Sequence, residues 1–181
     1  IVACLVGSEM CIRDRYKPEF IKIENMAVGS SLTLENPPNK KYKGESSHAL
    51  INGMGGTINY QDKSWQGFEA EDLIAIIDFG SAKTINTVEV RFLQSQVFWI
   101  FLPYHIQIEH SSDGKNFELI YEDFPSNNFS FEQKIISYKA NLGPLESRFI
   151  RVKGYNIDQC PDYHPGAGGP SWIFSDEIII N

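Results

Sequence analysis

The feature of this sequence that most constrains its fold is a succession of short apolar stretches with strand-like alternation, each closed by Gly, Pro, Asn or Asp. A period of two places alternate side chains on opposite faces of a strand, and no long helical pattern interrupts the series. The sequence therefore predicts an all-β fold, with roughly eight strands in a two-sheet sandwich. The expected strands cover residues 73–79, 85–93, 105–110, 117–121, 131–140, 148–152 and 172–180.

One turn is specified by its own residues. The tetrapeptide Ser111-Ser112-Asp113-Gly114 separates two of the expected strands. Asp-Gly is favoured in a tight hairpin turn because Gly adopts a positive φ without steric cost. The sequence therefore predicts that 105–110 and 117–121 pair as a β-hairpin.

Size and charge narrow the choice of partners. The chain has 181 residues, of which 42% are hydrophobic, which is enough for one packed core. The formal net charge is -7 and no basic run stands out, which argues against nucleic acid or an anionic membrane surface as a partner. The apolar stretch at residues 1–6 is too short to cross a bilayer, so we expect no membrane insertion.

The start of the chain differs in character from the rest. Codons for Glu9 to Asp14 can be written as the transposon end that is ligated to DNA in sequencing libraries, so we expect residues 1–15 to be a translated, non-native adapter. Cys4 and Cys11 fall in this leader, which leaves Cys160 alone and without an internal disulfide partner. Residues 16–28 are interpreted as a linker or the tail of an upstream domain, and residues 29–181 as the module itself.

Two long segments between the expected strands carry a distinctive set of residues. Residues 49–68 read ALINGMGGTINYQDKSWQGF, and residues 160–177 read CPDYHPGAGGPSWIFSDE. Between them lie WIFLP at 99–103, DGKNF at 113–117 and RFIRV at 148–152. In this order the strings resemble discoidin domains, also called coagulation factor V/VIII type C domains. They resemble in particular the module that follows the catalytic barrel in bacterial β-N-acetylhexosaminidases of glycoside hydrolase family 20.

The resemblance covers about residues 29–181 and carries expectations of its own. It implies an eight-stranded discoidin-like jelly-roll β-sandwich, a structural calcium ion under the first long segment, and glycan-contacting loops at one end. It also implies a non-catalytic, carbohydrate-binding accessory module from the C-terminal part of such a hexosaminidase, exported to the periplasm or the cell surface. The partners would be an N-acetylhexosamine-containing glycan and the catalytic domain of the parent enzyme.

Calcium takes about six to eight oxygen ligands, and a Gly-rich loop can turn several carbonyl oxygens inward. Related domains usually have Asp at the position of Asn52, so the neutral amide here predicts a weaker calcium affinity. The alternative is a Gly-rich turn held by hydrogen bonds alone. The expected ligands are the side chains of Asn52 and Glu177, oxygens of Ala49 and of Gly55 or Thr57, and Asp62 as a replacement charge.

Sugar binding needs an exposed aromatic face together with a few fixed polar groups, and both gather on loops. Trp65 and Trp172 adjoin strand starts, so core packing explains them better than sugar contact. Phe98 is a further loop aromatic, and the loops around Trp99 and His164 can equally serve structure. The expected ligand-contacting residues are Trp99, Tyr163, His164, Tyr60 and Tyr104.

Three functions follow from these residues. The leading one is glycan capture, the second is an interaction domain that docks on and braces the parent barrel, and the third is independent catalysis. Cys160 and His164 are too few for a closed zinc site. No nucleophile elbow, phosphate loop or zinc-protease helix is visible, and nothing fixes the separation of an acid and base pair. The carboxylates that could form such a pair are Glu69, Glu71, Asp72, Asp176 and Glu177.

Overall fold

The computed structural model describes residues 21–181, and the predicted leader at 1–15 and residues 16–20 lie outside this range. The all-β prediction is confirmed, and helical structure in the described range is limited to the 3-10 turns η1 (Ala49–Ile51) and η2 (Gln96–Phe98). No helix within residues 21–181 has the length and apolarity needed to cross a membrane. The strands are β1 (Ile21–Lys22), β2 (Ser31–Leu34), β3 (Met54–Gly55), β4 (Gln66–Glu69), β5 (Leu73–Gln94), β6 (His105–Ser111), β7 (Glu118–Asp123), β8 (Lys134–Tyr155) and β9 (Trp172–Ile180).

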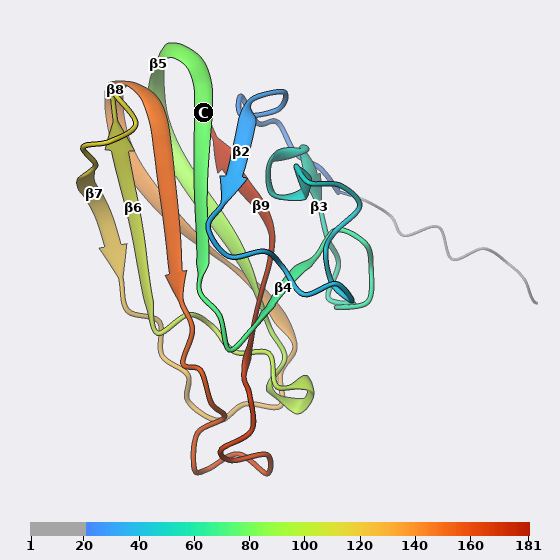
Figure 1. Cartoon of the computed structure of the whole chain (residues 1–181). Coiled ribbons are helices and arrows are strands. Elements are labelled where there is room, and N and C mark those ends of the chain that lie inside the picture. The colour runs from blue at the N-terminus through green and yellow to red at the C-terminus, as the bar shows by residue number, and fades with distance from the viewer. Residues whose placement is uncertain (1–20) are drawn as a thin grey trace, which may run out of the picture.

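Strands β5 and β8 are long enough to take part in both layers of the sandwich. The first part of β5 pairs with β2 and with the end of β8, and its second part pairs with β9 and the start of β8. Register shifts between Asp78 and Lys83 and between Ile85 and Thr87 mark the bend, which forms the arch in Figure 1. The polar stretch that separates 73–79 from 85–93 is therefore a bend within one strand, since pairing with β8 stops at Asp78 and resumes at Lys83.

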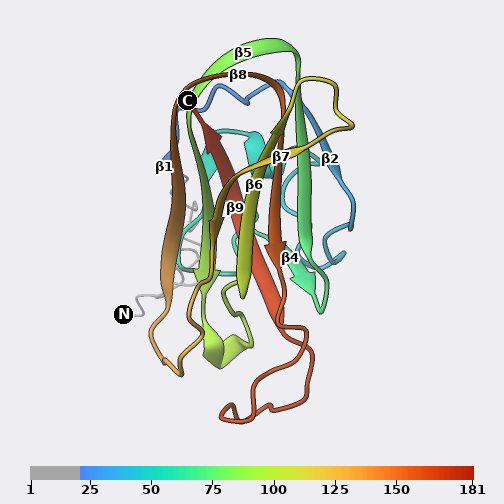
Figure 2. The ribbon, with the colours of Figure 1, turned by 90° about the vertical axis from the view of Figure 1, so that its left-hand side faces the viewer.

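The pairings define two antiparallel layers. One contains β2, the first part of β5, the end of β8, β6 and β7, and the other contains β4, β9, the second part of β5 and the start of β8. Figure 2 shows the first layer towards the viewer, with β9 running obliquely behind it. Alternate residues such as Ile106, Ile108 and Val152 point between the layers and are fully buried. The inward-facing positions therefore form one continuous core.

The predicted hairpin between β6 and β7 is confirmed. Gly114 has a φ of 73°, as the turn requires. The Asp113 carboxylate accepts hydrogen bonds from the backbone N–H groups of Asn116 and Lys115, both at 2.8 Å. These donors stabilise the charged carboxylate and hold the pKa of Asp113 well below its usual range.

The segment between β2 and β4 covers the outer face of the β9 layer and creates a second, smaller core. Leu93, Ile100 and Phe174 pack there with Trp65, which is 1% exposed. The Trp65 indole N–H donates to the Thr57 carbonyl oxygen at 2.9 Å, so the predicted structural role of this ring is confirmed. Figure 1 places this covering segment on the opposite side of the molecule from β6 and β7.

Residues 21–28, which belong to the segment interpreted as a linker or an upstream tail, contact the module directly. β1 pairs with β3, and the Met26 N–H donates to the Ile180 carbonyl oxygen at 2.9 Å. The Asn25 side chain donates to the Ile178 carbonyl oxygen at 2.8 Å. These bonds position Asn25 beside the acidic residues of β9.

Candidate functional site

Strand β9 carries two adjacent carboxylates that are both completely buried. Phe92 pairs with Ser175 and Val90 pairs with Ile178, so Arg91 lies opposite two residues, Asp176 and Glu177. This two-against-one arrangement is a β-bulge, which re-aims side chains relative to regular alternation. The bulge is how adjacent residues, which would otherwise face opposite sides of a sheet, both point into the interior.

Asp176 joins the strand to the Gly-rich loop and to a buried cation. Its Oδ2 atom accepts a hydrogen bond from the Gly56 N–H at 2.6 Å and forms an ion pair with Arg91 Nη2 at 3.1 Å. Arg91 Nη2 also lies 3.3 Å from the Gly56 carbonyl oxygen, and the Arg91 side chain is only 10% exposed. The guanidinium therefore holds the loop and the strand together at one point.

Glu177 joins the same loop to the start of the described chain. Its Oε1 atom accepts from Asn25 Nδ2 at 2.6 Å and from the Gly53 N–H at 2.8 Å. A ligand set that includes Asn52 and Glu177 requires the Gly-rich turn and the closing strand to meet in space, and these contacts bring the two together. The contacts also add Asn25, which the sequence did not single out.

The second oxygen of each carboxylate has no hydrogen-bond donor among the described residues. These orphaned atoms are Asp176 Oδ1 and Glu177 Oε2. Burial raises the pKa of Asp176 to about 7 and the pKa of Glu177 to about 7, against the opposing effects of Arg91 and Asn25 respectively. A buried carboxylate oxygen without a donor requires a proton or a cation, so this pair suits a hard metal ion.

The other expected metal ligands are engaged in closing turns. Asn52 Oδ1 accepts from the Met54 N–H at 2.9 Å, and Asp62 Oδ2 accepts from the N–H and hydroxyl of Thr57, both at 2.8 Å. Within residues 21–181 no three His, Cys, Asp or Glu residues gather in a group that could hold a metal. A cation here would therefore depend on the two orphaned carboxylate oxygens, on loop oxygens such as the carbonyl of buried Ala49, and on the second lone pair of Asn52.

A groove lined by aromatic rings lies beside this loop. We call it the aromatic groove, and its lining rings are Tyr42, Tyr60, Phe98, Trp172 and Phe174. Tyr60 and Phe98 are in contact, with ring centroids 4.6 Å apart, and Tyr42 packs edge-on against Phe174 at 4.9 Å. Phe98 is 44% exposed, so its ring is available at the surface. The groove continues into a depression of about 530 Å³ that also has polar lining from Asn59, Gln61 and Gln133.

The structure brings one of the five expected ligand-contacting residues, Tyr60, into this groove. Trp99 and His164 instead connect η2 to the loop at 160–170. A Cβ atom on Gly166 or Gly169 would lie 2.6 Å from the Trp99 ring, so both glycines are needed for this loop to cover the indole. The buried His164 ring donates from Nε2 to the Gln96 carbonyl oxygen and accepts from the Gly166 N–H at Nδ1.

The remaining two expected residues lie outside the aromatic groove. Tyr163 is 46% exposed and packs edge-on against Phe129, with ring centroids 6.0 Å apart. Tyr104 is half-exposed and contacts Tyr155 and His105 at the start of β6. The five residues are therefore spread over three places, since their loops leave the sandwich at different positions.

Sequence reasoning missed Tyr42 and assigned Trp172 to the core. Trp172 is in fact only partly buried and forms part of the groove wall, although its ring also packs on Phe174 at 5.8 Å. A usable signal for Tyr42 was present in the segment Lys40-Lys41-Tyr42-Lys43, which combines an aromatic ring with positive charge. This segment is a short basic run, so the expectation that the chain has none was wrong.

The layers, the long bent strands and the covering segment together define a discoidin-like β-sandwich. No family model matches the sequence, and no curated protein matches it. Solved structures share the fold, among them chitosan-binding module 1 of a chitosanase/glucanase from Paenibacillus sp. IK-5, with a TM-score of 0.56 and 13% identity over 87% of this chain and 98% of that chain.

Two further solved structures share this fold. The module CpGH89CBM32-6 of Clostridium perfringens has a TM-score of 0.53 and 16% identity, and it covers 87% of this chain and 98% of that chain. A fucose-binding module of Streptococcus pneumoniae has a TM-score of 0.55 and 12% identity, with 87% and 94% covered. At these identities the likeness establishes the fold.

The buried ion pair yields a test of what holds the loop in place. Replacing Arg91 with Ala removes the guanidinium and leaves the Asp176 carboxylate buried without its charge partner. We expect the free energy of unfolding to fall by about 3–5 kcal/mol in a urea titration. Arg148→Ala is the matched control, because its pair with Asp78 is much more exposed and should cost only about 0.2–1 kcal/mol. Equal losses in the two variants would show that the buried pair has no special role.

Proposed function

We propose that this chain is a non-catalytic carbohydrate-binding module that captures a glycan in the aromatic groove. The observation that carries the proposal is the groove itself, where the exposed ring of Phe98 and the neighbouring Tyr60 lie beside polar groups of Gln61 and Gln133. A sugar presents C–H groups on one face and hydroxyls around its edge. Aromatic rings contact the former, and amide side chains hydrogen-bond the latter.

The fold supports the same function. The three solved structures described above share this architecture, and two of them are named as chitosan-binding and fucose-binding modules. The groove is built on rigid elements, since Trp172 and Phe174 belong to β9 and Phe98 to the turn that follows β5. A rigid support keeps the rings in position for a ligand.

The resemblance in the sequence supports a finer proposal. The parent protein would be a β-N-acetylhexosaminidase of glycoside hydrolase family 20, and the glycan would contain N-acetylhexosamine. The protein would act in the periplasm or at the cell surface, where such glycans occur. Modest affinity would suffice, because tethering to a catalytic domain raises the effective concentration of the module at the substrate.

Removing one exposed ring tests the groove. We expect Phe98→Ala to weaken binding of GlcNAc- and GalNAc-containing oligosaccharides about tenfold, because stacking area is lost without disturbing the buried core. Binding is screened on a glycan array and measured by calorimetry with calcium present. Phe124→Ala is the control, since Phe124 is 64% exposed but stacks on His105 at the β6–β7 end. Failure of the unaltered protein to bind any of these sugars would overturn the proposal.

We further propose a structural calcium ion at the Gly-rich loop. Glu177 and Asp176 would hold it through their orphaned oxygens, with Asn52 and loop carbonyl oxygens completing the shell. When bound, the ion supplies positive charge to a site where two buried carboxylates face one guanidinium. The chain's own contribution is to anchor the loop that walls the groove.

Chelation tests this ion. We expect the melting temperature to fall after treatment with EDTA and to recover with calcium, because a ligand at a hundred times its Kd contributes about 2.7 kcal/mol to the native state. Glu177→Gln should reduce the calcium response, whereas Glu71→Gln, on an exposed residue, should preserve it. A melting temperature that changes neither with EDTA nor with added calcium would mean that hydrogen bonds alone hold the loop.

A second candidate function, docking on the parent catalytic domain, is favoured by a separate exposed patch. Phe131 is 74% exposed and contacts Phe129 at 4.6 Å, and Phe129 in turn contacts Tyr163. Exposed aromatic clusters of this kind are typical of protein contacts. In a structure of the full-length protein we expect this patch to be covered while Phe98 stays open. Burial of Phe98 against the neighbouring domain would instead favour bracing over sugar capture.

A further inference from the structure

Unpaired positive charge gathers at one end of the aromatic groove. A hollow of about 500 Å³ is lined by Lys40, Lys41, Lys43 and Lys63, and we call it the lysine hollow. All four lysines are exposed. Glu45 is the one carboxylate in its lining, so positive charge is in clear excess.

These lysines are free to bind a ligand. Every arginine in residues 21–181 forms an ion pair, as do Lys134, Lys139 and Lys153. Four of the remaining lysines meet in this one hollow, although the chain as a whole carries a net charge of -7. The lysines that make no ion pair within this range are Lys22, Lys40, Lys41, Lys43, Lys63, Lys83 and Lys115.

The lysine hollow is continuous with the aromatic groove. Lys41 and Tyr42 line both, and the Lys41 ammonium lies 4.9 Å from the centre of the Tyr42 ring. At the other end, Tyr60 and Phe98 connect the groove to its polar depression. A chain of sugars lying along the rings would therefore place its substituents beside the ammonium groups.

We propose that the ligand of this module is an acidic glycan, whose carboxylate or sulfate groups bind in the lysine hollow while its sugar rings stack in the aromatic groove. This inference rests on the proposed function and adds the charge class of the ligand. The acidic remainder of the surface repels a polyanion, which confines such a ligand to this region. Ammonium groups act as mobile point charges and accommodate either a carboxylate or a sulfate.

The test compares three probes of equal length by calorimetry at low salt. A chitin hexasaccharide is neutral, a hyaluronan hexasaccharide carries carboxylates, and a chondroitin sulfate hexasaccharide carries carboxylates and sulfates. We expect both acidic probes to bind about tenfold more tightly than the neutral one. We also expect their affinity to fall at least about threefold between roughly 50 and 500 mM NaCl, because salt screens exposed charges. The difference between the acidic probes identifies which anion is preferred.

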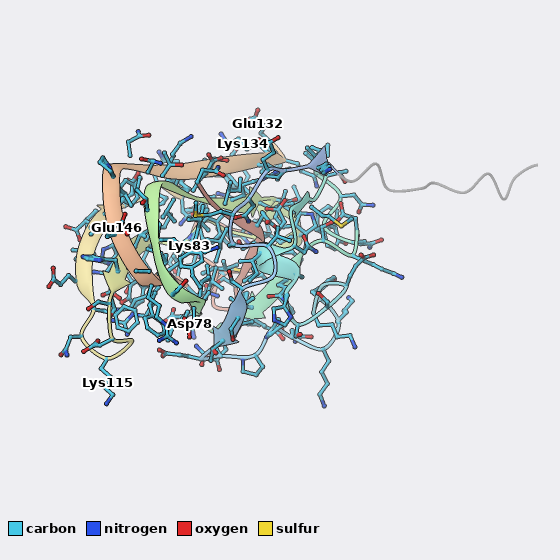
Figure 3. The ribbon with its side chains drawn as sticks, turned by 90° about the horizontal axis from the view of Figure 1, so that it is seen from above. Asp78, Lys83, Lys115, Glu132, Lys134 and Glu146 are labelled. Carbon is cyan, nitrogen blue, oxygen red and sulfur yellow. The ribbon has the colours of Figure 1, made fainter. Side chains whose placement is uncertain are left out.

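Removing lysine charges tests whether the preference for acidic probes arises in the lysine hollow. Lys40→Gln/Lys63→Gln should weaken the acidic probes by about two- to fivefold per lysine and leave the neutral probe unchanged, because these two lysines line the hollow and not the aromatic groove. Lys83→Gln/Lys115→Gln is the control with the same change in net charge, since Figure 3 shows Lys83 on the β5–β8 arch and Lys115 on the loop after β6. Each double variant is checked for an unaltered melting temperature, so that loss of binding reports the site.

The outcomes separate this inference from the proposed function. Salt-sensitive preference for the acidic probes, lost in the lysine-hollow variant but not in the control, supports the acidic glycan. Equal binding of neutral and acidic probes, or equal effects of the two double variants, overturns the inference while sugar binding stands. Absence of binding to all three probes and across the glycan array overturns both.

Discussion

The pairing of the bulged segment of β9 with the Gly-rich loop is the interaction on which the rest of the site depends. Asp176 accepts a hydrogen bond from the Gly56 N–H, and Glu177 accepts one from the Gly53 N–H. Arg91 connects the strand to the loop through its ion pair with Asp176. The same strand presents Trp172 and Phe174 to the aromatic groove a few residues earlier. Any shift of the loop therefore also moves the wall formed by Tyr60. The aromatic groove and the buried carboxylates are therefore structurally coupled through β9 and the Gly-rich loop.

The glycines of this loop are explained by close packing. A Cβ atom on Gly55 would lie 2.4 Å from Arg91 Nη1, and one on Gly56 would lie 2.8 Å from the Trp65 indole nitrogen. A side chain at either position would push the loop away from the guanidinium or from the second core. The glycines of this motif are thus required by the close approach of Arg91 and Trp65, whether or not a metal binds. A cation at the orphaned oxygens would add charge balance to an arrangement whose shape is already determined.

Local patterns were sufficient for most of the long strands and for the Asp113-Gly114 turn, because these depend on neighbours in sequence, but they did not identify the short strands β2 and β4. Local patterns were insufficient where a tertiary contact decides which way a side chain points. The bulge at Asp176 and Glu177 exists only because β9 pairs with β5 around Arg91, and regular alternation would place the two carboxylates on opposite faces. Likewise, Trp99 lies in a segment that ends at Pro103 and reads as an exposed loop aromatic, yet its ring packs against Gly166 and Gly169. The lysine hollow was missed because Lys63 joins the others only after folding.

The shape of the groove suggests how such a module works. Its walls are aromatic rings from β9 and from loops, and its central depression of about 130 Å³ is smaller than the hollows on either side. A shallow surface with a few exposed rings buries little of a ligand, so each sugar contact is weak. Tethering compensates for weak contacts, because a second binding event near the same polymer becomes intramolecular. The exposed patch around Phe131 lies on the same segment as Gln133, which lines the polar depression, so docking on a neighbour would fix the module next to its glycan-binding surface. A module fixed in this way would present its groove to the substrate in one orientation.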